Sequence, residues 1–129
     1  MSDFPNDLRY TKDHEWMRVS GNVARVGITT FAVEQLGDVT LVEMPAIGDE
    51  LEPEQVFGTV ESVKAVSDLF APVAGKVVKI NEALEDAPEL VNDDCMGEAW
   101  MVEIEMSEPA QADALLSADD YAKLVAEAS

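Results

Sequence analysis

Positive charge is scarce in this sequence. Its 129 residues include 8 lysines and arginines against 27 aspartates and glutamates, which gives a formal net charge of −19 at pH 7. Nucleic acids and anionic membrane surfaces are themselves negative, so such a chain would be repelled by both. We therefore predict that it binds neither nucleic acid nor a membrane. The charge favours a monomer that meets other proteins transiently through polar patches.

The chain is also poor in the residues that build thiol, imidazole and metal chemistry. Its single cysteine, Cys95, cannot form an internal disulfide, and its acidic neighbours disfavour a reactive thiolate. Its single histidine, His14, has no partner in a recognisable nucleophile motif, so we expect a structural role. One histidine and one cysteine cannot form a nitrogen–sulfur metal site, and the acidic runs lack calcium-loop spacing. We predict no metal.

Long apolar runs are absent, and none approaches the ~20 residues that span a bilayer. The acidic N-terminus has neither the cationic region nor the apolar stretch of a targeting segment. These features predict a bacterial cytoplasmic protein, or a mitochondrial-matrix protein in its mature form. The length predicts one domain over residues 1–129, large enough for an ordinary core.

Hydrophobic alternation and turn signals predict a mainly β chain. Strands are expected over residues 10–20, 23–28, 39–44, 55–62, 66–70, 73–80 and 100–106. A short internal helix should follow a hydroxyl cap at Thr29–Thr30 and end at Gly37. Residues 45–49 and 92–99 have the composition of loops, and residues 81–92 that of a polar connection.

The C-terminal region is predicted to be helical from about residue 107 to 128. A first short helix should end near Leu116, and Ser117 should cap a second one. The second helix has an apolar stripe expected to pack on the β structure, formed by Tyr121, Leu124, Val125 and Ala128.

Lys64 lies between two predicted strands, in a hairpin that extends over residues 55–75. A lysine at a hairpin tip points its amine into water, where another enzyme can reach and acylate it. An exposed lysine is ordinarily a solubility charge, so its neighbours decide the interpretation. Glu61 lies three residues before it, a small residue follows it, and a Pro-x-x-Gly turn ends at Gly75, eleven residues on.

This hairpin resembles the attachment site of lipoyl and biotinyl domains. Biotinyl domains typically have methionine on both sides of the lysine, whereas Val63 and Ala65 flank Lys64, which favours lipoate. The residues that carry the resemblance are Glu61, Ser62, Val63, Lys64, Ala65 and Gly75. They are most similar to the H-protein family of the glycine cleavage system, and further matches extend over nearly the whole chain, at residues 10–16, 26–29, 36–38, 67–68, 71–75, 88–92 and 100.

One stretch departs from the family pattern. The family usually has Asp-Pro-Tyr before Gly-x-Gly-Trp, whereas residues 94–100 read Asp-Cys-Met-Gly-Glu-Ala-Trp. Without the proline and the second glycine, the pattern predicts a looser loop with less access to positive φ.

The resemblance implies a flattened barrel-sandwich hybrid of two antiparallel sheets, with lipoate in amide linkage on Lys64. It implies a non-catalytic carrier that moves the aminomethyl group of glycine from a pyridoxal-phosphate glycine decarboxylase to a tetrahydrofolate-dependent aminomethyltransferase. It further implies reoxidation by a flavin dihydrolipoyl dehydrogenase, and attachment of lipoate by a ligase or transferase. We also expect Glu15 and Asp68 to accept a hydrogen bond from the amine of the loaded arm in a water-poor cleft.

Two other functions use the same lysine. A lipoyl-relay protein would donate lipoate to other carriers through the same hairpin. An enzyme with Lys64 as a Schiff-base nucleophile would need burial or nearby cations. Glu61 and Asp68 lie near Lys64 in the sequence instead, which disfavours the enzyme.

Overall fold

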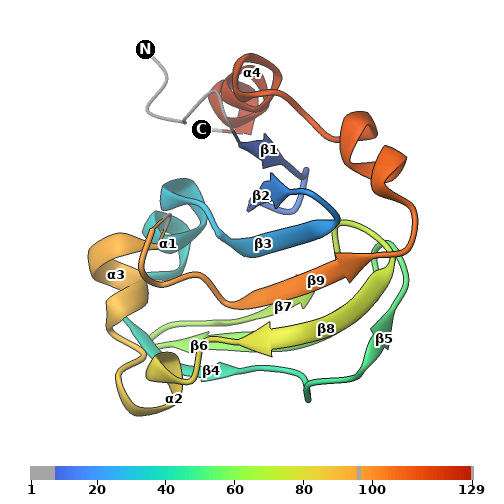
Figure 1. Cartoon of the computed structure of the whole chain (residues 1–129). Coiled ribbons are helices and arrows are strands. Elements are labelled where there is room, and N and C mark those ends of the chain that lie inside the picture. The colour runs from blue at the N-terminus through green and yellow to red at the C-terminus, as the bar shows by residue number, and fades with distance from the viewer. Residues whose placement is uncertain (1–7, 96, 129) are drawn as a thin grey trace.

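Two antiparallel β-sheets form the body of the molecule, as Figure 1 shows for a computed structural model that describes residues 8–95 and 97–128. The larger sheet has six strands in the order β1-β2-β3-β9-β8-β5, and the smaller sheet has three in the order β4-β6-β7. The expected fold of two antiparallel sheets with an internal helix and C-terminal helices is confirmed.

Strand bounds in the larger sheet are β1 Arg9–Tyr10, β2 Glu15–Ser20, β3 Val23–Ile28, β5 Glu50–Leu51, β8 Gly75–Ile80 and β9 Val102–Met106. In the smaller sheet they are β4 Val39–Glu43, β6 Val56–Ser62 and β7 Val66–Phe70. The main core lies between the sheets, and its fully buried side chains include Val26, Val60, Val77 and Ile104. Phe57, Val60 and Leu69 anchor the β6–β7 hairpin in this core, whereas residues 63–68 at and after its tip are exposed.

Among the described residues, three helices precede the C-terminal region: α1 Thr30–Leu36, α2 Ala83–Asp86 and α3 Leu90–Asp94. The hydroxyl of Thr29 caps α1 by accepting a hydrogen bond from the Ala32 amide at 3.3 Å, as the sequence predicts. Helices α1 and α3 lie at the same end of the sandwich (Figure 1).

The C-terminal region forms a 3-10 helix, Pro109–Ala114, and then α4, Ala118–Ala128, which lies beside β1, an edge strand of the larger sheet (Figure 1). Ser117 accepts a hydrogen bond from the Asp120 amide, so its capping role is confirmed. The predicted stripe packs as expected through Tyr121, Leu124 and Val125 in a second apolar cluster with Tyr10. The side chain of Ala128 lies outside the described part of the chain.

Three sequence-based assignments were wrong. Residues 10–20 are two strands, because Thr11 Oγ1 accepts from the amides of Asp13 and Glu15 and forms a tight turn. The polar connection at 81–92 contains α2 and most of α3, each anchored by one buried side chain, Leu84 or Val91. Because α3 runs to residue 94, it also takes the first part of the loop expected at 92–99.

Two further differences concern short elements. Strand β5, which was not predicted, directly follows the expected 45–49 loop; it pairs with β8 over only two residues, too few to show alternation. The first C-terminal helix is of the 3-10 type and is confined to Pro109–Ala114. No helix among the described residues is long and apolar enough to cross a membrane.

Candidate functional site

The tip of the β6–β7 hairpin is closed by the side chain of Ser62. Its Oγ accepts hydrogen bonds from the amides of Lys64 and Ala65 at 3.3 and 3.0 Å, and donates to the Ala65 carbonyl at 3.1 Å. The backbone adds a bond from the Ser62 amide to the Ala65 carbonyl at 2.8 Å. A hydroxyl has one donor and two acceptor sites, so this loop uses all of them. The tip thus forms without glycine or proline.

Lys64 lies at this tip and is exposed to solvent, as predicted. Val63 before it is 70% exposed, and no carboxylate within residues 8–95 or 97–128 lies in salt-bridge distance of the amine. The stem of Lys64 lies over Gly37, where an added Cβ would be 3.3 Å from Lys64 Cε. The ammonium group is therefore available to a second protein.

The turn after α1 contacts the tip of the β6–β7 hairpin and supports it. The Val63 amide donates to the Asp38 carbonyl at 3.0 Å, which ties the tip to the start of β4. Gly37 has φ 84°, a conformation that favours glycine. The resemblance to the H-protein family includes residues 36–38, but it did not predict that they support the hairpin.

The other predicted recognition residues are placed in two groups. Glu61 pairs with Val66 next to the tip, and Ala65 lies in the tip itself. Gly75 lies in the other sheet, paired with Leu51 and Met106. A Cβ on Gly75 would meet the Glu105 carbonyl oxygen, so close packing of β8 on β9 explains glycine there.

Glu15 is buried, with 1% of its surface exposed. Its Oε2 accepts from the Phe70 amide at 2.6 Å, whereas its Oε1 has no hydrogen-bond partner in the described part of the chain. Burial raises the pKa of this carboxyl well above its usual value, although the Phe70 hydrogen bond opposes the shift. Glu15 lines a mostly apolar cavity of about 450 Å³ with Ala71, Pro72 and Leu115.

Asp68 is exposed and lies opposite Thr59 in the β6–β7 ladder. It is two residues from Phe70, the partner of Glu15, but the cavity that Glu15 lines does not include it. Asp68 therefore lies on β7 and Glu15 on β2, where it contacts the end of β7 through Phe70, and the structure does not join the two predicted arm residues in one described site.

His14 and Cys95 have structural surroundings. His14 Nδ1 lies 2.8 Å from the Tyr121 hydroxyl, which in turn lies 2.7 Å from Thr29 Oγ1, and desolvation lowers the pKa of the histidine. Cys95 is buried, and the loss of water raises the pKa of its thiol to about 11. The Cys95 thiol therefore stays protonated at neutral pH and lacks the environment of a nucleophile, and His14 is held in place by Tyr121.

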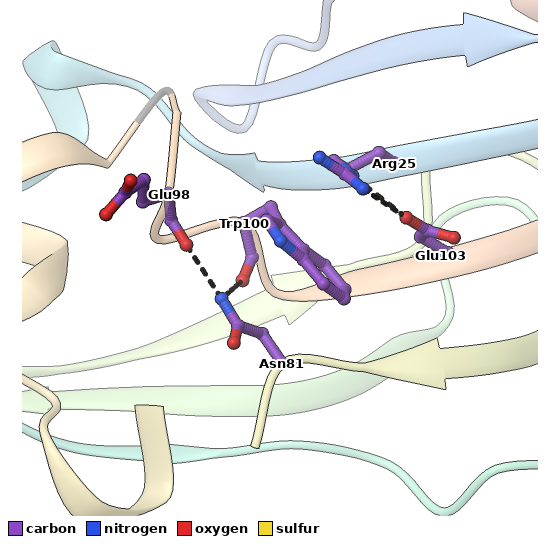
Figure 2. Close-up of polar contacts among 5 residues, drawn as sticks. All are labelled: Arg25, Asn81, Glu98, Trp100 and Glu103. Atoms are coloured by element: carbon purple, nitrogen blue, oxygen red, sulfur yellow. Dashed lines mark hydrogen bonds and ion pairs between the residues drawn. The ribbon is translucent and has the colours of Figure 1, made fainter. Parts of the chain in front are cut away.

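The atypical loop before β9 is held by hydrogen bonds to its backbone (Figure 2). Asn81 Nδ2 donates to the carbonyls of Glu98 and Trp100, both at 2.8 Å, and Trp16 Nε1 donates to the Cys95 carbonyl at the same distance. Asp94 Oδ2 accepts from the Glu98 amide at 3.0 Å. Neither Gly97 nor Ala99 has positive φ, which agrees with the reduced access to that region expected without the second glycine.

A charged group lies beside this loop on the outer face of the larger sheet. Arg25 donates to Glu103 Oε2 at 2.7 and 2.9 Å (Figure 2), and its guanidinium lies 4.7 Å from the centre of the Trp100 ring. The pair and the stacking position Trp100 at the entrance to β9.

Comparison with known proteins agrees with these features. The chain is 50% identical over 127 residues to a glycine cleavage system H protein of Halalkalibacterium halodurans, covering 98% of this chain and 99% of the relative. A relative of the same name from Carboxydothermus hydrogenoformans is 51% identical over 127 residues, with 98% of each chain covered. The crystal structure of a glycine cleavage system H protein from Mycobacterium marinum superposes with a TM-score of 0.86 at 37% identity, covering 93% of this chain and 97% of that one.

The sequence profile of one family matches nearly all of the chain. Its description is Glycine cleavage H-protein, and the match extends over residues 8–128. With half of the residues shared with full-length relatives, the chain belongs to the glycine cleavage H-protein family.

Proposed function

We propose that this chain is a lipoyl carrier of the glycine cleavage system, and that Lys64 is its attachment residue. The observation that supports the proposal is the exposed Lys64 amine at a hairpin tip closed by Ser62. Family membership supports the glycine cleavage role. The role is that of a carrier, since the chemistry belongs to the cofactor and to partner enzymes.

The residues at the tip fit an amide-linked lipoyl group. Acylation removes the charge of Lys64, and no described carboxylate loses an ion partner as a result. Val63 and Val66, which are 70% and 62% exposed, offer an apolar surface beside the amide. Exposure also removes the basis for a Schiff-base enzyme, because such a lysine needs burial or a cationic neighbour to lower its pKa.

The bound group would supply a disulfide that is reduced as it accepts the aminomethyl group left by decarboxylation of glycine; after that group leaves, the flavin dehydrogenase would reoxidise the dithiol to the disulfide. The partners we propose are the pyridoxal-phosphate glycine decarboxylase, the tetrahydrofolate-dependent aminomethyltransferase, the flavin dihydrolipoyl dehydrogenase and a lipoate ligase or transferase. A single domain, a monomeric state and a bacterial cytoplasmic location complete the proposal, and bacterial relatives support the location.

We further propose that the Glu15 cavity shelters the loaded arm. Its unpartnered Oε1 is a buried acceptor beside an apolar wall, which suits a protonated amine. Phe70, whose amide donates to Glu15, lies six positions after Lys64, so the arm would have to run along β7 to reach the cavity. Asp68, being exposed, would act at the cavity approach.

Mutants of these carboxylates test the shelter. Glu15→Gln and Asp68→Asn should both be lipoylated normally, and each should release formaldehyde faster than wild type from the loaded carrier when no transferase is present. Release rates equal to wild type in both variants would remove these residues from the proposal.

Peptide mass mapping tests the attachment itself. Protein produced in lipoate-fed cells should have one lipoyl mass, on the peptide containing Lys64. A lipoyl mass on another lysine, or on none, would overturn the assignment. Glycine–bicarbonate exchange with purified decarboxylase then distinguishes the glycine cleavage carrier from a lipoyl-relay protein, for which this exchange is not needed.

A further inference from the structure

Asn92 makes two hydrogen bonds to a segment far from it in the sequence. From α3, its Oδ1 accepts from the Val39 amide at 2.9 Å and its Nδ2 donates to the Gly37 carbonyl at 3.2 Å. The two bonds join residues 53 and 55 positions apart. The side chain thus contacts the backbone on both sides of Asp38 and closes the turn that follows α1.

The same turn holds the attachment hairpin. The Asp38 carbonyl accepts from the Val63 amide at 3.0 Å, and Gly37 lies beneath the stem of Lys64. A continuous set of contacts therefore runs from Asn92 through the turn to the residue before the lysine and to the lysine stem. The supports of the tip lie at the end of the sandwich where α1 and α3 gather (Figure 1).

We propose that Asn92 is a positioning residue for acylation of Lys64. It fixes residues 37–39, and these fix the backbone and stem of the lysine that the modifying enzyme must reach. The inference rests on the proposed function, because its effect is on the enzyme that attaches lipoate. An enzyme that acts on a fixed geometry gains affinity when the substrate loop is already ordered.

Core packing does not account for this side chain. Asn92 is exposed, whereas α3 is anchored by Val91, which is fully buried. The Asn92 amide also makes its own helical-turn bond, to the Glu89 carbonyl at 3.0 Å, which involves no side chain. A primary amide supplies one donor and one acceptor from a single planar group, and neither aspartate nor leucine does so.

Two substitutions separate the contacts. Asn92→Ala removes both bonds. Asn92→Asp keeps an acceptor for the Val39 amide, loses the donor, and sets a carboxylate oxygen against the Gly37 carbonyl. Two controls match them: Asp93→Ala changes an exposed residue of the same helix, and Asn81→Ala removes two side-chain-to-backbone bonds in the loop before β9.

The experiment measures the rate at which a purified lipoate ligase, with lipoate and ATP, modifies each full-length variant, followed by intact mass. For Asn92→Ala and Asn92→Asp we expect KM for the carrier to rise on the order of threefold to tenfold, the effect of losing one or two net hydrogen bonds, with a smaller change in kcat. Amide hydrogen exchange should accelerate at Val63 and stay unchanged at Val26 in β3. Both controls should keep the wild-type KM.

The outcomes separate the two proposals. If wild-type protein has no lipoate on Lys64, the proposed function is wrong. If wild type is modified and both Asn92 variants keep its KM and its Val63 exchange, the positioning role is wrong. If Asn81→Ala raises KM as much as Asn92→Ala does, general destabilisation explains the result and the positioning role is also wrong.

Discussion

At the scale of single residues, Lys64 and Glu15 differ in their exposure to solvent. Lys64 is exposed at a hairpin tip and can be altered at little cost to the fold. Glu15 is buried with one oxygen unpartnered, which costs stability whenever the carboxylate is charged. Each residue therefore gives a prediction of a different kind, one about modification and one about stability.

Lys64→Arg should fold normally and accept no lipoate. The charge and most of the stem are retained, so the free energy of unfolding should change by no more than about 0.5 kcal/mol. A guanidinium does not form the amide. Urea denaturation and intact mass measure the two effects, and glycine–bicarbonate exchange retained by the purified variant would contradict the carrier mechanism.

Glu15→Gln should alter how stability depends on pH. The folded protein raises the pKa of Glu15, so it binds that proton more tightly than the unfolded chain does. The contribution of Glu15 to the stability of wild type therefore falls as pH rises from ~4.3 through the raised folded-state pKa, and it levels off above that pKa. Glutamine has no proton to lose, so the stability of the variant relative to wild type should rise over the same window.

Urea denaturation at a series of pH values between 4 and 8 measures that difference. All other carboxylates are common to both proteins and cancel in the comparison. A difference that stays constant across the series would show that Glu15 titrates normally in the folded state.

At the scale of elements, the β6–β7 hairpin depends on one hydroxyl. Ser62→Ala should lower stability by no more than about 1 kcal/mol, because the lost bonds are exposed, yet it should slow lipoylation because Lys64 and Ala65 lose their amide acceptor. Ser62→Thr, which keeps the hydroxyl, should restore the rate. Equal rates for Ala and Thr would show that the loop forms without this side chain.

The C-terminal helix α4 depends on a second hydroxyl. Tyr121→Phe keeps the stacking on Tyr10, whose ring centre is 4.9 Å away, but removes the contacts of the hydroxyl with His14 and Thr29. We expect a loss of about 1–2 kcal/mol with no change in lipoylation. Lys123→Ala, at an exposed position of the same helix, should stay within about 0.5 kcal/mol of wild type.

The sequence predicted the elements that show a local pattern of their own. It did not predict the elements that form through contacts with residues far away in the chain. The hairpin around Lys64 and the cap at Thr29 were predicted correctly because alternation and cap chemistry are local. The turn that divides residues 10–20 was missed because it needs His14 at φ 68°, which is uncommon outside glycine.

Packing determines the elements without a periodic pattern. Helices α2 and α3 have four and five residues, too few to show a helical period, and each is held by one side chain in the core. The support of the hairpin by residues 37–39 was also not predictable, because it joins segments that only the folded chain brings together. Exposure of Lys64 followed from the sequence. Of the two residues expected in a water-poor cleft, Glu15 is buried and Asp68 is exposed.

At the scale of the whole molecule, the net charge of −19 has a measurable effect. Like charges repel more strongly in the compact folded state than in the expanded unfolded chain. Raising sodium chloride from about 10 to 200 mM shortens the screening length from roughly 30 Å to below 10 Å. Stability measured by urea denaturation should therefore increase over this range, and a value that falls would show that ion pairs such as Arg25–Glu103 outweigh the repulsion.

The loop before β9 has a consequence for which mutations the molecule tolerates. Its hydrogen bonds to Asn81 and Trp16 end on carbonyl oxygens, which every residue type supplies. Most substitutions of residue 98 should therefore leave these hydrogen bonds intact. The conformation of the loop depends instead on the side-chain donors outside it. In a saturation library selected for folded protein, position 98 should accept most amino acids, whereas position 16, which is also buried, should accept very few.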